Sequence, residues 1–170
     1  MFWEEKTMEH FSPEEWEMIC LKCGKCCCVK HEDNENVFFT NRLCESFDLS
    51  SGLCKRYDSR LCADCLKVDW SLLCNNAKML PKSCAYRQLK EEGKLPEYHP
   101  LITGDADSVR KAKQSVLDWE DVHTIADIRN ATNRVLIEAD RKNWTISQYE
   151  DAIEDAIRPY PMIIVEKHKK

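Results

Sequence analysis

The chain has 170 residues, a formal net charge of −5 and 43% hydrophobic residues. This composition is typical of a soluble globular protein, and the length suits one ordinary domain or a small domain with an extension. The acidic balance argues against a nucleic-acid partner. No stretch approaches the ~18 apolar residues of a membrane span, and the acidic start MFWEEKTMEH lacks the parts of a signal peptide. We therefore expect a cytoplasmic protein with no membrane partner.

The beginning of the chain predicts one helix and one strand. Ser12, Pro13 and Glu15 form the pattern of a helix start with a capping box, and that helix would carry Cys20 to its end. The apolar run at residues 37–40 follows a polar turn and predicts a short strand.

The middle of the chain predicts short elements between loops. Residues 50–62 have the pattern of a loop or short hairpin, and residues 63–84 that of one or two helical turns broken near Pro81. A further helix is expected over residues 83–93, where a glycine stops it.

The pattern changes after the Pro- and Gly-containing loop at residues 94–108, which is the expected domain boundary. Apolar residues recur at helical spacing over residues 119–141 and again over 145–157, where Thr145 and Gln148 form a capping box. The apolar run in the tail, residues 161–170, favours a strand that docks on the rest of the protein.

The cysteines are confined to one part of the chain. All eleven lie between Cys20 and Cys84. An odd number cannot pair completely in disulfides, and the consecutive Cys26, Cys27 and Cys28 are poor disulfide partners because the geometry of the bond is demanding. In a reducing compartment this spacing favours a metal site over a disulfide scaffold or unligated thiols.

Cys20, Cys23 and Cys26 form the pattern CxxCxxC. Gaps of two residues let successive thiolates turn onto one ion, and three cysteines at this pitch resemble the first ligands of a ferredoxin run, so a fourth ligand must come from elsewhere in the chain. The side chains of neighbours such as Cys26 and Cys27 diverge, so the two would bridge two ions or serve two sites. The CADC segment at residues 62–65 offers another pair.

Several blocks within residues 2–104 carry a resemblance to a known family: FWEEKT, WEMICLKCGKCC, FTNRLC, CKRYDSR, DCLKV and LPKSCAYRQLKEEGKLPEYHPLITG. With these blocks the sequence resembles the YkgJ/YcgN-type cysteine-cluster proteins, which are marked by CxxCxxCC and described as zinc- or iron-chelating. A related cysteine cluster occurs in flagellin lysine methylases, where an iron–sulfur cluster is implicated.

The resemblance implies eight metal ligands: Cys20, Cys23, Cys26, Cys27, Cys44, Cys54, Cys65 and Cys84. Cys28, Cys62 and Cys74 lie outside the pattern and are expected to be small buried or spare thiols. Eight thiolates suit two four-thiolate sites or one joined cluster. The expected cofactor is an iron–sulfur cluster or Zn2+ in one or two thiolate-bound centres, since both accept sulfur ligands.

We therefore expect a mainly α protein with short β elements. A small metal-stapled cysteine-cluster domain would cover residues 1–104, and a helical C-terminal extension over residues 105–170 would pack on it. Metal binding would supply folding free energy to a segment with many polar loops.

Other residues near the cysteines carry weaker signals. His31 is a surface residue or a ligand, and His99 holds a loop or has a functional role with Tyr98 beside it. The block CKRYDSR offers four further side chains, those of Arg56, Tyr57, Asp58 and Arg60. They would tune or hold the cluster through ion pairs and N–H···S bonds, or they would bind a substrate anion.

Three functions follow from these patterns. The first is a cytoplasmic redox or metal-binding module, with a protein partner bound through the C-terminal helices. The second is an enzyme, or an accessory subunit, that uses a redox cluster in the modification of proteins or small molecules. The third is a regulator that senses metal or oxygen. The sequence assigns no catalytic residue and does not decide whether the protein is an enzyme.

Overall fold

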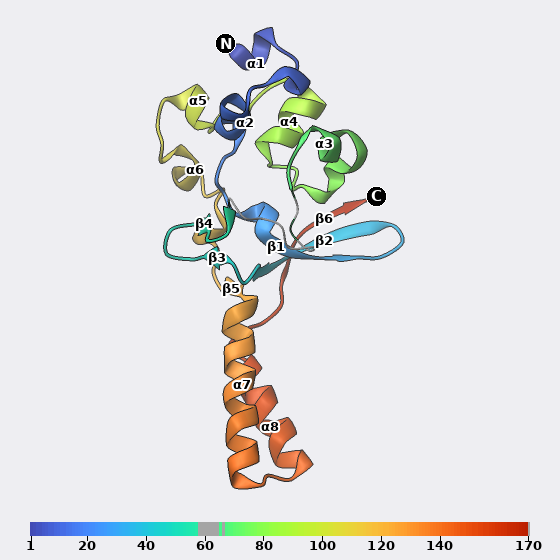
Figure 1. Ribbon diagram of the computed structural model, residues 1–170, viewed down its shortest axis with the longest axis vertical. Helices are drawn as coiled ribbons and strands as arrows, with labels where there is room; N and C mark the ends of the chain where they lie inside the picture. Colours follow the sequence, from blue (N-terminus) through green and yellow to red (C-terminus); the bar gives the residue numbers. More distant parts are fainter. Residues whose placement is uncertain (58–64, 66, 170) are drawn as a thin grey trace.

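The computed structural model describes residues 1–57, 65 and 67–169. About 48% of the described residues are helical and 16% lie in strands, so the protein has a mixed α and β fold rather than the mainly α fold expected from the sequence. The additional strand content comes from pairing between distant segments, which local patterns do not reveal. In Figure 1 a body of short elements carries one long helical hairpin that projects away from it.

Short helices at the N-terminus lead to the cysteines. They are α1 (Phe2–Glu5), a 3₁₀ turn (Met8–His10) and α2 (Pro13–Ile19). The predicted capping box starts α2: the Glu15 amide donates to Ser12 Oγ at 3.2 Å, and the Ser12 amide donates to the Glu15 carboxylate at 2.9 Å. Cys20 caps the C-terminus of this helix, so the next cysteines lie on the loop that follows.

A four-stranded sheet is built around one central strand. Its members are β1 (Cys28–Glu32), β2 (Asn36–Leu43), β5 (His123–Thr124) and β6 (Ile164–Lys169). Strand β2 pairs antiparallel with β1 and with β6, and parallel with β5. The predicted strand at 37–40 is therefore longer than expected, because partners from three parts of the chain satisfy its backbone.

Two further strands form a small ladder beside the sheet. Strands β3 (Phe47–Asp48) and β4 (Leu53–Cys54) pair antiparallel, with Phe47 opposite Cys54. This confirms the hairpin turned at Gly52, while Asp58 to Asp64 lie outside the described residues.

The next helices form the upper part of the body in Figure 1. They are α3 (Trp70–Asn76), a 3₁₀ turn (Ala77–Met79), α4 (Ala85–Glu92), α5 (Pro100–Thr103), α6 (Ser108–Lys111) and a 3₁₀ turn (Val116–Asp118). The predicted helix over 83–93 is α4, which follows Cys84 and ends at Gly93 in the left-handed conformation.

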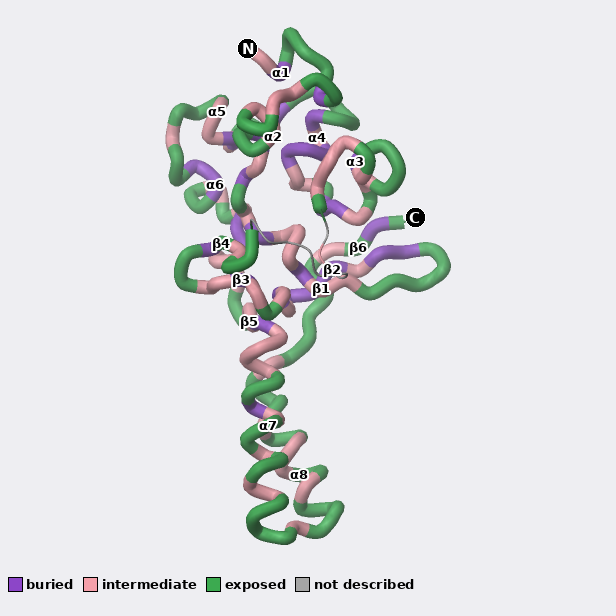
Figure 2. The backbone as a smooth tube through the Cα atoms, viewed as in Figure 1, coloured by how far each residue is buried: buried purple, intermediate pink, exposed green. Residues whose placement is uncertain are grey.

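The projecting hairpin consists of α7 (Ile125–Lys142) and α8 (Ile146–Ile157). Helix α7 begins six residues later than Trp119, where the sequence pattern begins, because β5 occupies the preceding residues. The predicted capping box of Thr145 and Gln148 starts α8. Figure 2 shows that the hairpin is mostly exposed or partly buried, because its two helices pack mainly against each other.

The buried side chains form two hydrophobic cores. The first core lies among the helices of the body and includes Ile19, Leu80 and Leu89. The second lies at the sheet and includes Phe39, Leu43, Phe47 and Val116. The proposed division at residues 104/105 stays a prediction, and residues from both sides of it contribute to both cores and to the sheet.

Within the described ranges, no helix has the length and apolar character that crossing a bilayer requires.

Candidate metal centre

One cavity of ≈ 930 Å³ collects the cysteines that the sequence predicts as ligands. All eight line it, from segments as far apart as the end of α2 and the start of α4: Cys20, Cys23, Cys26, Cys27, Cys44, Cys54, Cys65 and Cys84. Cys28, which the sequence set aside, also lines the cavity and is buried. Cys74 is exposed on α3 and does not line it, and Cys62 lies outside the described residues.

The CxxCxxC segment curls because two of its residues adopt the left-handed conformation. Lys22 has φ of 51° and Gly24 has φ of 76°. Gly24 is needed there, because its Cα lies against Val116 and Phe47 with no room for a Cβ. The curl turns Cys20, Cys23 and Cys26 toward the same cavity.

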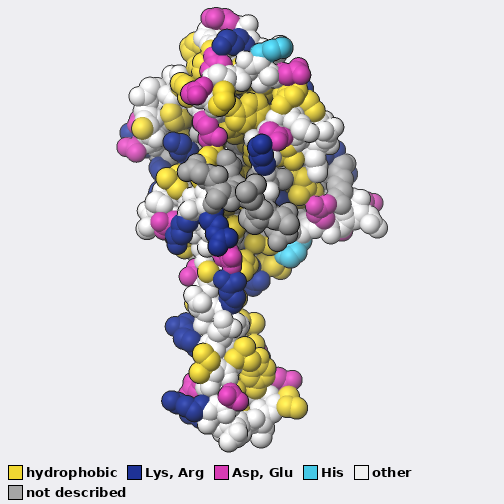
Figure 3. Space-filling view, in the orientation of Figure 1, with side chains coloured by type: hydrophobic (Ala, Val, Ile, Leu, Met, Phe, Trp, Pro, Cys, Tyr) yellow, Lys and Arg dark blue, Asp and Glu magenta, His cyan; other side chains and the backbone are white. Residues whose placement is uncertain are grey.

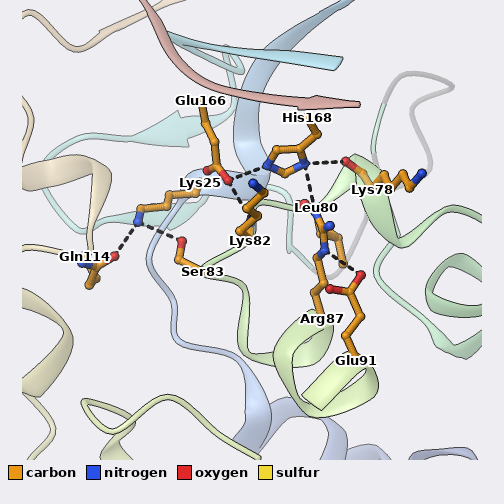
Figure 4. A network of polar contacts seen from close by, with 10 residues as sticks. All are labelled: Lys25, Lys78, Leu80, Lys82, Ser83, Arg87, Glu91, Gln114, Glu166 and His168. Carbon is orange, nitrogen blue, oxygen red and sulfur yellow. Dashed lines mark hydrogen bonds and ion pairs between the residues drawn. The ribbon is translucent and has the colours of Figure 1, made fainter. Parts of the chain in front are cut away.

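A lysine between two of the cysteines fixes this segment to the rest of the body. Lys25 Nζ donates to Ser83 Oγ at 3.0 Å and to Gln114 Oε1 at 2.8 Å, as Figure 4 shows. Ser83 precedes Cys84, so Lys25 brings the fourth cysteine of this region beside the first three. The Val116 amide adds a hydrogen bond to the Cys23 carbonyl at 2.9 Å. Sequence reasoning missed the role of Lys25, although its position between Cys23 and Cys26 was a signal.

Backbone amides donate to several of the cysteine sulfurs, among them those of Cys20 and Cys44. The Lys22 amide lies 3.4 Å from Cys20 Sγ, and the Ser46 amide lies 3.5 Å from Cys44 Sγ. In each case the amide belongs to the second residue after the cysteine. Such N–H···S bonds favour a thiolate and tune the metal that it binds.

Burial, and to a lesser extent the neighbouring thiols, raise the pKa of cysteines at the cavity. Burial raises the pKa of Cys20 to about 12 and that of Cys23 to about 11, and the neighbouring Cys26 adds to both shifts. Burial also raises the pKa of Cys84, and the charges of Cys23 and Cys26 add to it. A bound cation would offset this desolvation and repulsion, because the metal ligand is the thiolate.

The donor set fits a soft metal. Sulfur is the predominant donor type around the cavity, and thiolate ligands select zinc or iron–sulfur clusters over magnesium or calcium. The ten described cysteines form no disulfide with one another. However, no group of three or more His, Cys, Asp or Glu side chains in residues 1–57, 65 and 67–169 is arranged as a metal-holding set, so the ligand assignment stays a prediction.

The histidines have different positions. His31 is exposed on β1 and does not line the cavity. His99 is buried and caps α5: its Nδ1 accepts from the Leu101 amide at 3.0 Å, and its Nε2 donates to the Ile19 carbonyl at 3.1 Å. Burial lowers the pKa of His99. These bonds give it the structural role that the sequence left open, and Tyr98 donates to the Ser83 carbonyl instead of orienting it.

Part of the CKRYDSR block lies at the cavity. Arg56 and Tyr57 line it, and the Tyr57 hydroxyl donates to the carboxylate of Glu17. Asp58 and Arg60 lie outside the described residues.

The C-terminal strand is attached beside the cavity by a polar network that sequence reasoning missed. Arg87 Nη1 donates to the Leu80 carbonyl at 2.8 Å and lies 2.9 Å from His168 Nδ1 on β6 (Figure 4). His168 Nε2 lies 2.5 Å from Glu166, whose carboxylate also accepts from the Lys82 amide at 2.9 Å. The network fixes β6 to the segment that ends at Cys84.

Fold and cavity together define a cysteine-rich protein of mixed α and β structure. The chain is 37% identical over 147 residues to the UPF0260 protein VV2402 of Vibrio vulnificus, a match that covers 84% of this chain and 90% of that one. It is 42% identical over 122 residues to a UPF0260 protein of Rhizorhabdus wittichii, covering 69% and 83% of the two chains. The chain belongs to the UPF0260 family.

This result corrects the family assignment made from the sequence. The relatives are UPF0260 proteins, so the assignment to the YkgJ/YcgN-type cysteine-cluster proteins is wrong. That assignment depended on short blocks around the cysteines, whereas the relatives match over most of their length. No family model matches the chain. No solved structure matches it either.

Proposed function

We propose that the protein is a metal-binding module that holds an iron–sulfur cluster or zinc through its clustered cysteine thiolates. The observation that supports this most directly is the cavity, whose lining includes nine cysteines from separate segments, among them all eight predicted ligands. Thiolates that lie close together are destabilised, because they repel one another and lose hydration. A bound cation would offset both effects.

The surroundings of the cavity also support the proposal. Lys22, Lys30 and Arg56 line it and would lie near the negative charge that a four-thiolate site around a divalent ion carries. Three carboxylates, those of Glu17, Glu32 and Glu45, also line it, so the charged side chains of the lining balance one another. The amides at Cys20 and Cys44 donate to sulfur as they do around bound metals. A bound cluster would supply electron transfer, and zinc would supply stability. Either one requires reduced thiols, which the cytoplasm maintains.

The first test is the metal content of the protein purified without oxygen. We expect metal in stoichiometric amount. An absorbance near ~400 nm with acid-labile sulfide identifies an iron–sulfur cluster, and a colourless protein with zinc identifies the structural alternative.

Substitution of one predicted ligand gives the second test. Cys23→Ser should lower the metal content per chain and increase cleavage by proteases within residues 20–84, because the metal organises that region. Cys74→Ser is the matched control, since Cys74 is exposed and lies away from the cavity. A Cys23→Ser protein with the metal content and protease resistance of the control would contradict the proposal.

A further inference from the structure

The strand β6 is fixed where it begins but buries little apolar surface. The Asn41 side chain accepts from the Ile163 amide at 2.8 Å and donates to the Pro161 carbonyl at 3.0 Å. Among the described strands, β6 pairs with β2 alone. Its apolar side chains stay in contact with solvent, since Ile164 is 55% exposed and Val165 is 39% exposed. A segment with so few buried apolar contacts opens at a lower free energy than the core of a protein does.

His168 holds the other end of β6. This residue is only 3% exposed, and its ring packs against Phe39 of β2 at a centroid distance of 5.0 Å. Its Nε2 lies 2.5 Å from the carboxylate of Glu166. Its Nδ1 lies 2.9 Å from Arg87 Nη1 on α4 and 3.1 Å from the Lys78 carbonyl. The histidine therefore joins β6 to the sheet on one side and to the helical part of the body on the other.

The contacts of β6 reach one segment of the body, residues 78–87. Arg87 also donates to the Leu80 carbonyl at 2.8 Å, and the Glu166 carboxylate accepts from the Lys82 amide at 2.9 Å (Figure 4). This segment forms part of the wall of the cysteine cavity, through Met79, Pro81, Cys84, Ala85 and Tyr86. No described residue of β6 lines the cavity, so the strand supports this wall from behind.

We propose that β6 is a strap on the cysteine cavity: residues 164–169 detach from β2 as a unit, and the cavity wall formed by residues 78–87 is then free to move. Asn41 keeps the preceding residues in place, so the strap pivots there. Strand β2 keeps its pairing with β1, so the rest of the sheet survives the opening. The buried guanidinium of Arg87 loses its partner on β6, which favours its movement toward water.

The consequence concerns access to the thiols. Cys84 lies on the wall that the strap supports, so its sulfur should become accessible to solvent and to reagents when β6 detaches. The strap does not depend on what the thiols bind, and its test is therefore separate from that of the metal.

Hydrogen exchange of the unmodified protein gives the first test. The amides of Leu80, Lys82 and Cys84 are hydrogen-bonded, and they should exchange through the same opening as the amides of β6, with equal protection at low urea concentrations. The amides that pair β1 with β2 should be protected more strongly. The proposal is overturned if β6 exchanges while these three amides keep the protection of the β1–β2 ladder.

Substitution of the residue that holds the strap gives the second test. His168→Ala should increase exchange in β6 and at the Lys82 amide by about tenfold, because it removes buried hydrogen bonds. Alkylation of Cys84 by iodoacetamide, followed by peptide mass spectrometry, should become faster by a similar factor. The rate at Cys74 should not change, because Cys74 is exposed and lies away from the cavity.

Lys169→Ala is the matched control, since Lys169 is an exposed residue of the same strand, and it should leave all of these rates unchanged. Faster exchange in β6 of the His168→Ala protein, with unchanged rates at Lys82 and Cys84, would show that the cavity wall does not depend on the strap. If His168→Ala does not fold, the exchange of the unmodified protein decides the question.

Discussion

Gly24 shows how one residue shapes the candidate site. A Cβ at this position would lie 2.6 Å from Val116 Cγ2 and 2.7 Å from Phe47 Cζ, and its φ of 76° is in the left-handed region. At this turn between Cys23 and Cys26, a residue with a Cβ would therefore clash with these side chains and would also have an unfavourable backbone conformation.

We expect Gly24→Ala to lower the free energy of unfolding by about 2 kcal/mol more than Gly104→Ala does. Gly104 is the matched control, because its φ of 69° gives the same backbone strain while nothing lies within 4 Å of its Cβ position. Urea denaturation of both variants measures the difference. Equal losses would show that Val116 and Phe47 move aside at little cost.

At the scale of single residues, the sequence predicted the ends of several helices. The caps at Ser12 and Thr145 and the stop at Gly93 depend on a few adjacent residues, so their patterns could be read directly. The hydrogen bonds of Lys25 could not be predicted, because Gln114 lies 89 residues away in the chain.

At the scale of elements, one buried side-chain amide supplements the backbone pairing of β2. Asn41 Nδ2 donates to the carbonyls of Asp121 and Pro161, at 2.6 and 3.0 Å, and its Oδ1 accepts from the Ile163 amide at 2.8 Å. The side chain therefore joins β2 to the segments that lead into β5 and β6.

Asn41→Ala should lower the free energy of unfolding by about 1 kcal/mol, because it removes three partly buried hydrogen bonds between the side chain and the backbone. Hydrogen exchange should also become faster across Ile164–Lys169. The control is Asn130→Ala, which changes an exposed residue of α7 and should have little effect. Unchanged exchange in β6 would mean that its pairing with β2 does not need Asn41.

Local periodicity predicted the helices better than the strands. Helices α4, α7 and α8 appear near their expected positions, since their hydrogen bonds are made within each segment. Strands β1 and β5 were not predicted, because a strand requires partners that are remote in the sequence.

At the scale of the whole molecule, the hairpin of α7 and α8 is a projection whose two ends lie together. The rings of His123 and Tyr160 are 4.8 Å apart at its base, and an exposed ion pair of 2.7 Å links Arg129 to Glu45. Hydrophobic side chains are visible along it in Figure 3. Ile137 and Ile146 are among the exposed apolar residues of its helices. The expectation that it binds a protein partner stays a prediction.

Replacement of residues 132–155 by a short Gly–Ser linker should leave the metal content per chain unchanged, because the excised segment does not line the cysteine cavity. Insertion of the same linker after Asn143, at the tip of the hairpin, is the control. Metal analysis and circular dichroism check the result. A loss of metal in the excised protein alone would show that the hairpin stabilises the body that holds the cysteines.

The sequence alone indicated a metal site, because the number and spacing of cysteines are properties of the chain, and the eight candidate ligands came from the resemblance to a cysteine-cluster family. It did not distinguish the UPF0260 family from another cysteine-rich family. Only the tertiary structure decided that Cys84, Cys44 and Cys54 line the same cavity as Cys23 and Cys27. The physical reason is that these proximities depend on hydrogen bonds and packing between segments far apart in the chain, which no local pattern records.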